Sequence, residues 1–105
     1  MLFRSNKILG TQNTLAADKL HEAAELARIL TTAKIALFRA IKERPGSITD
    51  IASRLQRDRS AVKRDIDELE KAGLVSVAER PFAGHGRFKE VRAAADRVVL
   101  TAVFA

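Results

Sequence analysis

The most regular pattern of apolar and polar positions lies between residues 46 and 75 and predicts two helices joined by a tight turn. The apolar positions of the first helix fall on one side, at Ile51, Ala52 and Leu55. Thr49 can cap this helix, and Asp58 can cap the second after a polar break at residues 56–58. The second helix has one narrow apolar stripe, formed by Val62, Ile66 and Leu69. Gly73 follows at a position where a left-handed residue often ends a helix, so the segment predicts a helix-turn-helix.

Two more helices are predicted upstream of this segment. Residues 14–30 carry a broad apolar arc, formed by Leu15, Leu20, Ala23, Ala24, Leu26, Ala27 and Leu30. An arc of this width suits a dimerisation helix, and packing within a single chain explains it equally well. The next helix runs to Glu43 from a cap at Thr31 or Thr32, with core positions at Ala33, Leu37, Phe38, Ala40 and Ile41. Pro45 and Gly46 then stop it.

The rest of the chain predicts strands. Residues 47–48 suit a very short strand, and residues 74–78 alternate as a strand that leads through a loop at 81–86 to extended chain at 88–91. This hairpin is the expected wing, although a solvated turn is the plainer interpretation. Residues 97–104 are apolar on both faces, so we expect them to be buried, either as a third strand of the hairpin sheet or against a second subunit.

These elements predict an α+β fold, mainly α: a winged helix-turn-helix with an extra N-terminal helix and a C-terminal β-strand. The chain has 105 residues, enough for one domain with a single small core. We assign residues 14–105 to that domain and residues 1–13 to an N-terminal arm. The arm shows no period, so contact with DNA, packing on a dimer partner and fraying all remain open.

Charge is distributed unevenly along the second helix of the helix-turn-helix. Residues 54–64 hold five bases and one acid, whereas the acids of this helix come in its later turns. A helix that enters the major groove by its first turns needs such a gradient, and the net charge of +6 favours a polyanionic partner. A solvated surface helix is the alternative. The candidate DNA contacts are Arg57, Arg59, Ser60, Lys63 and Arg64, together with Arg80, Arg87 and Lys89 near the hairpin tip.

A resemblance to a known family rests on the same segment. The helix-turn-helix core of the MarR/ArsR-like winged-helix transcription regulators is similar to ITDIASRLQRDRSAVKRDIDELEKAGLV. Within that superfamily, a small archaeal and bacterial branch has a recognition helix that resembles residues 61–65, AVKRD. The resemblance covers roughly residues 30–100. It implies a winged helix that binds duplex DNA, usually as a homodimer, and it names neither an operator nor a signal.

Several classes of function find no support in the residues. The chain has no cysteine, which excludes disulfides, thiol catalysis and cysteine-based metal sensing. No nucleophile lies near a plausible base and no phosphate-binding glycine loop follows a strand, so we expect neither an enzyme nor a cofactor. His21 and Glu25 are spaced for a metal, but such a pair is usually solvated and we assign no metal site. No apolar run approaches the roughly 18 residues of a membrane span and no leader is evident, so we expect a cytoplasmic protein.

The leading hypothesis is a sequence-specific regulator that binds double-stranded DNA, acts as a dimeric repressor and resembles the autoregulating antitoxin of a toxin–antitoxin pair. The alternative is a winged-helix adaptor that binds a protein partner through its apolar segments. RNA binding is a third hypothesis, weakened because the chain has five Phe and no Tyr or Trp on which bases could stack. Salt dependence separates the first two, since only the regulator should bind duplex DNA and lose affinity steeply with salt.

Overall fold

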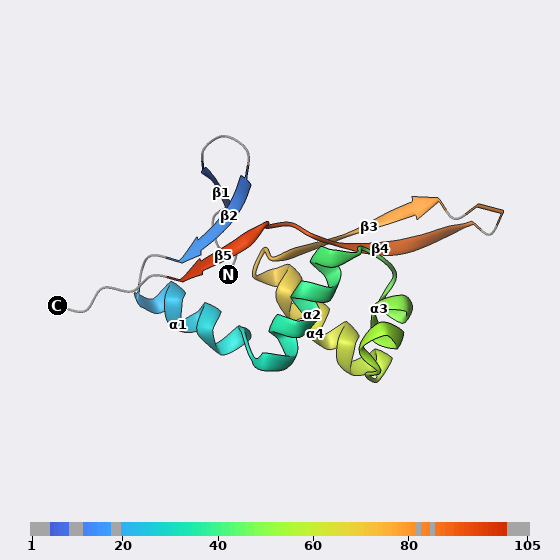
Figure 1. Ribbon diagram of the computed structural model, residues 1–105, viewed down its shortest axis with the longest axis horizontal. Coiled ribbons are helices and arrows are strands. Elements are labelled where there is room, and N and C mark those ends of the chain that lie inside the picture. The colour runs from blue at the N-terminus through green and yellow to red at the C-terminus, as the bar shows by residue number, and fades with distance from the viewer. Residues whose placement is uncertain (1–4, 9–11, 18–19, 82, 85, 101–105) are drawn as a thin grey trace.

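The computed structural model describes residues 5–8, 12–17, 20–81, 83–84 and 86–100, with side chains for residues 24–81, 83–84 and 86–99. Its helices are α1 (Leu20–Ile29), α2 (Thr32–Glu43), α3 (Ile48–Leu55) and α4 (Arg59–Lys71). Its strands are β1 (Ser5–Ile8), β2 (Gln12–Ala17), β3 (Val75–Pro81), β4 (Arg87–Ala93) and β5 (Arg97–Leu100). The β3–β4 hairpin extends beyond the helices at one end of the molecule, and the remaining strands lie beside α1 at the other end (Figure 1).

The helix boundaries follow from local capping. Thr31 and Asp58 cap α2 and α4 as predicted, because each side chain accepts a hydrogen bond from a backbone N–H three residues ahead. Ser47 caps α3 in the same way, so the predicted cap at Thr49 is wrong and the helix begins at Ile48. The predicted left-handed position at Gly73 is confirmed by its φ of 86°.

The β3–β4 hairpin is antiparallel, with Val77 opposite Val91. Gly46 joins β4 through two hydrogen bonds to the backbone of Val91, at 2.8 and 3.2 Å. The short strand predicted at residues 47–48 is therefore a single bridge at Gly46, because Ser47 is already committed to capping α3. A side chain at residue 46 would require the Asp50 carboxylate to move, since its Cβ would lie 2.6 Å from one of the carboxylate oxygens.

A separate sheet has the strand order β1-β2-β5, in which β2 pairs antiparallel with β1 and parallel with β5. The prediction of a helix over residues 14–30 is wrong for its first part, because residues 14–17 lie in β2 and α1 begins at Leu20. Pairing of residues 14–17 with residues 97–100 overrides the helical propensity of the alanines. The same pairing places β5 outside the hairpin sheet, contrary to the expectation of a third strand there.

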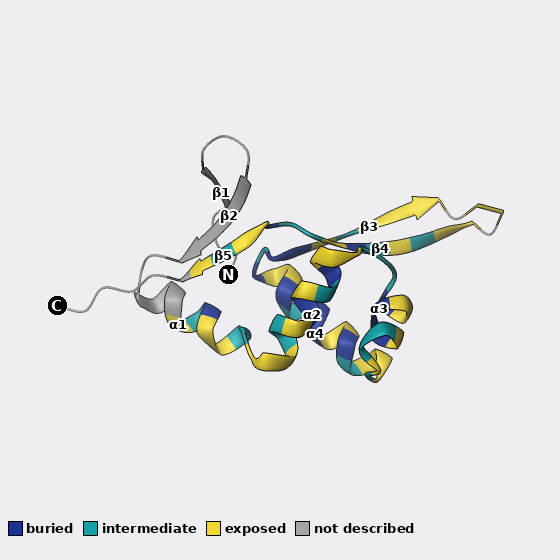
Figure 2. Ribbon diagram, in the orientation of Figure 1, coloured by how far each residue is buried: buried dark blue, intermediate teal, exposed yellow. Residues whose placement is uncertain are grey.

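The core lies where α2, α3 and α4 meet the base of the hairpin, and Figure 2 shows the buried residues gathered there. The predicted stripe of α4 is confirmed, since Val62, Ile66 and Leu69 are all 0% exposed. In α2 the burial is narrower than predicted, because Ala33 is exposed while Leu37, Phe38 and Ile41 are buried. The chain is thus an α+β fold of four helices and a small antiparallel hairpin, compatible with a winged helix. Within the described residues, no helix is long and apolar enough to cross a membrane.

Candidate nucleic-acid interface

The α4 helix presents a polar face away from the core. Burial of its apolar stripe fixes the rotation of the helix, so Arg59, Ser60, Lys63 and Arg64 are all exposed. The start of the helix is held firmly: Asp58 caps it, and Nε of Arg59 donates a hydrogen bond to Oγ1 of Thr49 at 3.0 Å. This bond ties the first turn of α4 to α3. Four of the five residues predicted in the helix-turn-helix therefore share one accessible surface.

Arg57, the fifth predicted contact, is turned inward. Its Nη2 donates to Oδ2 of Asp65 at 2.8 Å, and the Asp65 side chain is 7% exposed. Nη1 of Arg57 is buried and has no hydrogen-bond partner among the described residues. Nε of Arg64 also lies 3.8 Å from this carboxylate, but its side chain is 70% exposed. Arg57 thus links the turn before α4 to the buried side of that helix.

Arg54, the first base of the cationic segment, has a similar internal role. Its guanidinium donates to the carbonyl oxygens of Ala40 and Arg44, at 3.1 and 2.7 Å, and to Asp50 at 3.1 Å. The two carbonyls lie at the end of α2, and the Ala40 oxygen also accepts a hydrogen bond from the backbone N–H of Arg44. Arg54 therefore joins α3 to the end of α2. Two of the five bases between residues 54 and 64 stabilise the helix-turn-helix from within.

The exposed cations of the interface are mostly paired with acids. On α4, Nζ of Lys63 lies 2.9 Å from Oδ2 of Asp67, and both side chains are about half exposed. On the hairpin, Arg80 lies 3.2 Å from Glu90, and Arg87 lies 3.4 Å from Glu79. Exposed pairs such as Lys63–Asp67 and Arg87–Glu79 are worth at most about 1 kcal/mol, so a phosphate can replace the carboxylate at low cost.

Glu90 is the most strongly held acid of the hairpin. A hydrogen bond from the Arg92 guanidinium, and a weaker contribution from Arg80, hold the pKa of the Glu90 carboxyl below its ordinary value. The preceding residue, Lys89, is exposed and forms no ion pair with any described residue. His85, which the sequence places at the hairpin tip, lies outside the described residues.

A groove of about 270 Å³ separates α4 from the hairpin and is lined by one lysine from each. Lys63 lines it from α4 and Lys89 lines it from β4. The acids Asp67, Glu70 and Glu79 also line the groove. The charge gradient predicted from the sequence places Asp67 and Glu70 in the later turns of α4, and the spacing of residues 63 and 67 by four positions indicates a helical ion pair. The pairing of Arg57 with Asp65 joins the turn before α4 to the helix itself, and no sequence spacing predicts it.

Comparison with known proteins places this arrangement in a family. Residues 29–100, more than two thirds of the chain, match the family HVO_A0114. The chain belongs to the HVO_A0114 family. The matched segment begins at the end of α1 and includes the whole helix-turn-helix, the hairpin and β5.

The structure of this HVO_A0114 family member is similar to that of a possible transcriptional regulator from Methanosarcina mazei Go1. The TM-score is 0.57 and the sequence identity is 14%, over 89% of this chain and 76% of that protein. At this identity the similarity concerns the fold alone. A comparison with curated proteins finds no match.

Proposed function

We propose that this HVO_A0114 family member is a transcription regulator that binds double-stranded DNA in a sequence-specific manner. The observation that carries the proposal is that Lys63 of α4 and Lys89 of the hairpin line one groove, while the apolar stripe on the opposite face of α4 is buried. In this arrangement the first turns of α4 enter the major groove and the hairpin reaches the adjacent minor groove or phosphates. The printed name of the similar structure, a possible transcriptional regulator, agrees with this function.

Each set of residues has a distinct part in the proposed complex. Lys63 and Arg64 lie one turn into α4 and contact base edges, where a good contact discriminates by about 1–3 kcal/mol. Arg59 and Ser60, at the helix start, contact phosphates, as do the cations of the hairpin. Arg57 contributes indirectly, because its bond to Asp65 holds α4 in register with the turn.

The test begins with selection of bound duplexes from a random pool, followed by mobility-shift titration of the best sequence. Lys63→Ala with Arg64→Ala should weaken binding of that duplex by about 1–3 kcal/mol for each base edge that the variant can no longer reach. Lys71→Ala is the matched control, because it removes an exposed cation from the last turn of the same helix. Equal affinity of the double variant and wild type would contradict the assignment of α4 as the recognition helix.

We also propose that the regulator is a homodimer that acts in the cytoplasm as a repressor, with autoregulation of the antitoxin type as one form. Within the described residues β5 pairs on one side only, and Val99 on this strand is 37% exposed. An open strand with an exposed apolar residue is suited to association with a second copy. Two recognition helices about 34 Å apart would then read half-sites about 10 bp apart.

Light scattering tests the dimer. Val99→Glu should give monomers at tens of micromolar and reduce binding to the selected palindrome more than binding to random DNA. Leu26 does not offer an equivalent test, because it is 0% exposed within a single chain and a charge there would disrupt the core. A wild-type protein that is monomeric and binds one subunit per duplex would contradict the dimer and leave DNA binding intact.

A protein–protein adaptor is the second candidate, and the pairing of Lys63, Arg80 and Arg87 with carboxylates favours it. These acids neutralise part of the surface that DNA would contact. The two functions differ in salt dependence: a regulator loses affinity for duplex DNA steeply as salt rises, whereas an adaptor shows no such affinity at any salt concentration.

A further inference from the structure

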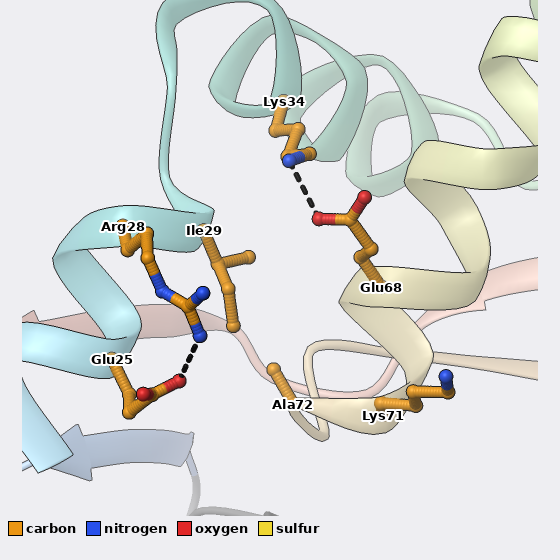
Figure 3. Close-up of a pocket in the computed structure, with 7 residues that line it drawn as sticks. All are labelled: Glu25, Arg28, Ile29, Lys34, Glu68, Lys71 and Ala72. Atoms are coloured by element: carbon orange, nitrogen blue, oxygen red, sulfur yellow. Dashed lines mark hydrogen bonds and ion pairs between the residues drawn. The ribbon is translucent and has the colours of Figure 1, made fainter.

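Several hollows lie against α2, and two of them differ in charge. The hollow between α1, α2 and α4 has a volume of about 340 Å³ and contains its own ion pairs, which Figure 3 shows. Lys34 reaches Glu68 at 2.7 Å across the space between α2 and α4, and Arg28 is bonded to Glu25 on α1. Each acid in this hollow already has a base, and the lining also includes Lys71, which forms no ion pair with any described residue.

The second hollow is a groove of about 370 Å³ between α2 and β5. Its apolar lining comes from Leu30, Ile35, Phe38 and Val98. Its polar lining comes from Arg39, Lys42 and Arg97, and none of the described residues that line it is acidic. The exposed side chain of Arg39 has no ion-pair partner among the described residues. The groove therefore combines an apolar surface with a cation, Arg39, that has no acidic partner among the described residues.

The apolar and cationic residues are separated along the groove. Ile35, Arg39 and Lys42 follow one another at four and three residues, so they form a row along α2 about 10 Å long. Nζ of Lys42 is bonded to the backbone carbonyl of Asp96, which brings the start of β5 and hence Arg97 to the cationic end of that row. The opposite end contains Ile35 and Leu30.

We propose that this groove binds a small organic anion, a carboxylate carried on an apolar body. The body lies on Ile35, Phe38 and Val98, and the carboxylate meets Arg39 and Lys42. The volume is within the usual range of ligand pockets, about 300–1,000 Å³. A second copy of this chain is a poor occupant, because two surfaces with the same cations would repel each other.

The site is separate from the proposed DNA-binding surface. None of the residues that line the groove belongs to α3, α4 or the hairpin strands. Ligand binding and DNA binding can therefore be measured separately, and the failure of one proposal leaves the other standing.

The probes are octanoate, 1-octanol and octylammonium, which share an apolar body and differ in head-group charge. Each is titrated into the full chain while backbone amide resonances are followed by NMR. Octanoate should shift the resonances of residues 35–42 and 97–98, and 1-octanol should bind about tenfold more weakly because it lacks the charge-assisted bond. Octylammonium should bind more weakly still. Equal binding of octanoate and 1-octanol, or shifts spread over the whole surface, would overturn the proposal.

Three variants locate the ligand within the fold. Arg39→Gln should weaken octanoate binding about tenfold and leave 1-octanol binding unchanged, because the exposed Arg39 serves only the head group. Val98→Thr keeps the shape of the side chain, makes it polar, and should weaken both ligands. Lys71→Gln, which removes the same charge outside the groove, is the control and should change neither. If Lys71→Gln weakened octanoate binding as much as Arg39→Gln does, the attraction would come from the net charge of the protein rather than from this groove.

Discussion

Replacement of Arg57 by Met should destabilise the fold more than the loss of a surface charge normally does. The substitution keeps most of the apolar stem and removes the guanidinium that donates to Asp65 at 2.8 Å. Asp65 is only 5% exposed, so its carboxylate would remain in the interior with little access to water. Arg64 would be the nearest described cation, at 3.8 Å and on a largely exposed side chain.

The magnitude follows from the burial of the two partners. Removal of one member of a fully buried ion pair costs about 3–5 kcal/mol. Arg57 is 25% exposed, so water can enter the space that it leaves, and Arg64 can move closer to the carboxylate. Both effects reduce the cost, and we expect about 2–3 kcal/mol. A domain of this size has a total stability of roughly 5–15 kcal/mol, so the variant should fold but melt roughly 10 °C lower.

Urea unfolding followed by far-UV circular dichroism measures this loss, and a double-mutant cycle assigns its cause. Asp65→Leu with Arg57→Met removes both charges, so the double variant should recover much of the stability that Arg57→Met loses. Asp65→Leu alone would leave Arg57 partly buried without its partner and should also be destabilising. The buried pair would be refuted as a stabilising link if the losses of unfolding free energy in the two single variants added up in the double variant. It would also be refuted if the stability of Arg57→Met lay within about 0.5 kcal/mol of wild type.

Three further predictions concern the candidate interface and its charges. Lys89→Ala should lower the slope of log affinity against log salt by about 1. Arg87→Ala should lower it by less, because Glu79 already neutralises Arg87, and equal slopes in the two variants would contradict this. Asp67→Asn should raise DNA affinity a few-fold in mobility shifts by releasing Lys63, and unchanged affinity would argue against a contact by that lysine. The folded-state pKa of Glu90 is lowered, so the ionised carboxylate stabilises the fold above the ordinary glutamate pKa, and this contribution is lost as pH falls through the lower value. In Glu90→Gln the free energy of unfolding should therefore depend less on pH below about pH 5.

Local signals are enough to predict the helical part of the fold. The caps at Thr31 and Asp58, the stripe of α4 and the end at Gly73 each depend on residues within a few positions of one another. The capping residues and the apolar periodicity can therefore be recognised from neighbouring positions in the sequence. The hairpin follows from alternation in residues 74–78 and the glycines of the loop, and its pairing is the one that such a hairpin requires.

Long-range pairing is beyond the reach of the same reasoning. Residues 14–17 have helical propensity, and only their parallel partner, more than 80 positions away, makes them a strand. The apolar arc assigns Leu26 to a dimer surface, whereas its place in the core depends on how α1 folds back on the other helices. The inward direction of Arg54 and Arg57 depends on acceptors in other elements, which a count of charges along one helix does not include.

The paired charges have a consequence for how the proposed interface would discriminate between DNA sequences. Lys63 and its partner Asp67 are both about half exposed, so the pair costs little to open when a base edge or phosphate takes the place of the carboxylate. On a duplex that does not place an acceptor near Lys63, the ion pair stays closed and the Asp67 carboxylate is repelled by the DNA phosphates. Non-specific attraction then depends mainly on cations without an acidic partner, such as Lys89. Because such attraction scales with the number of phosphates neutralised, closed pairs lower affinity for random DNA more than affinity for a matched site. Acids within the cationic surface would thus increase specificity at a small cost in total affinity.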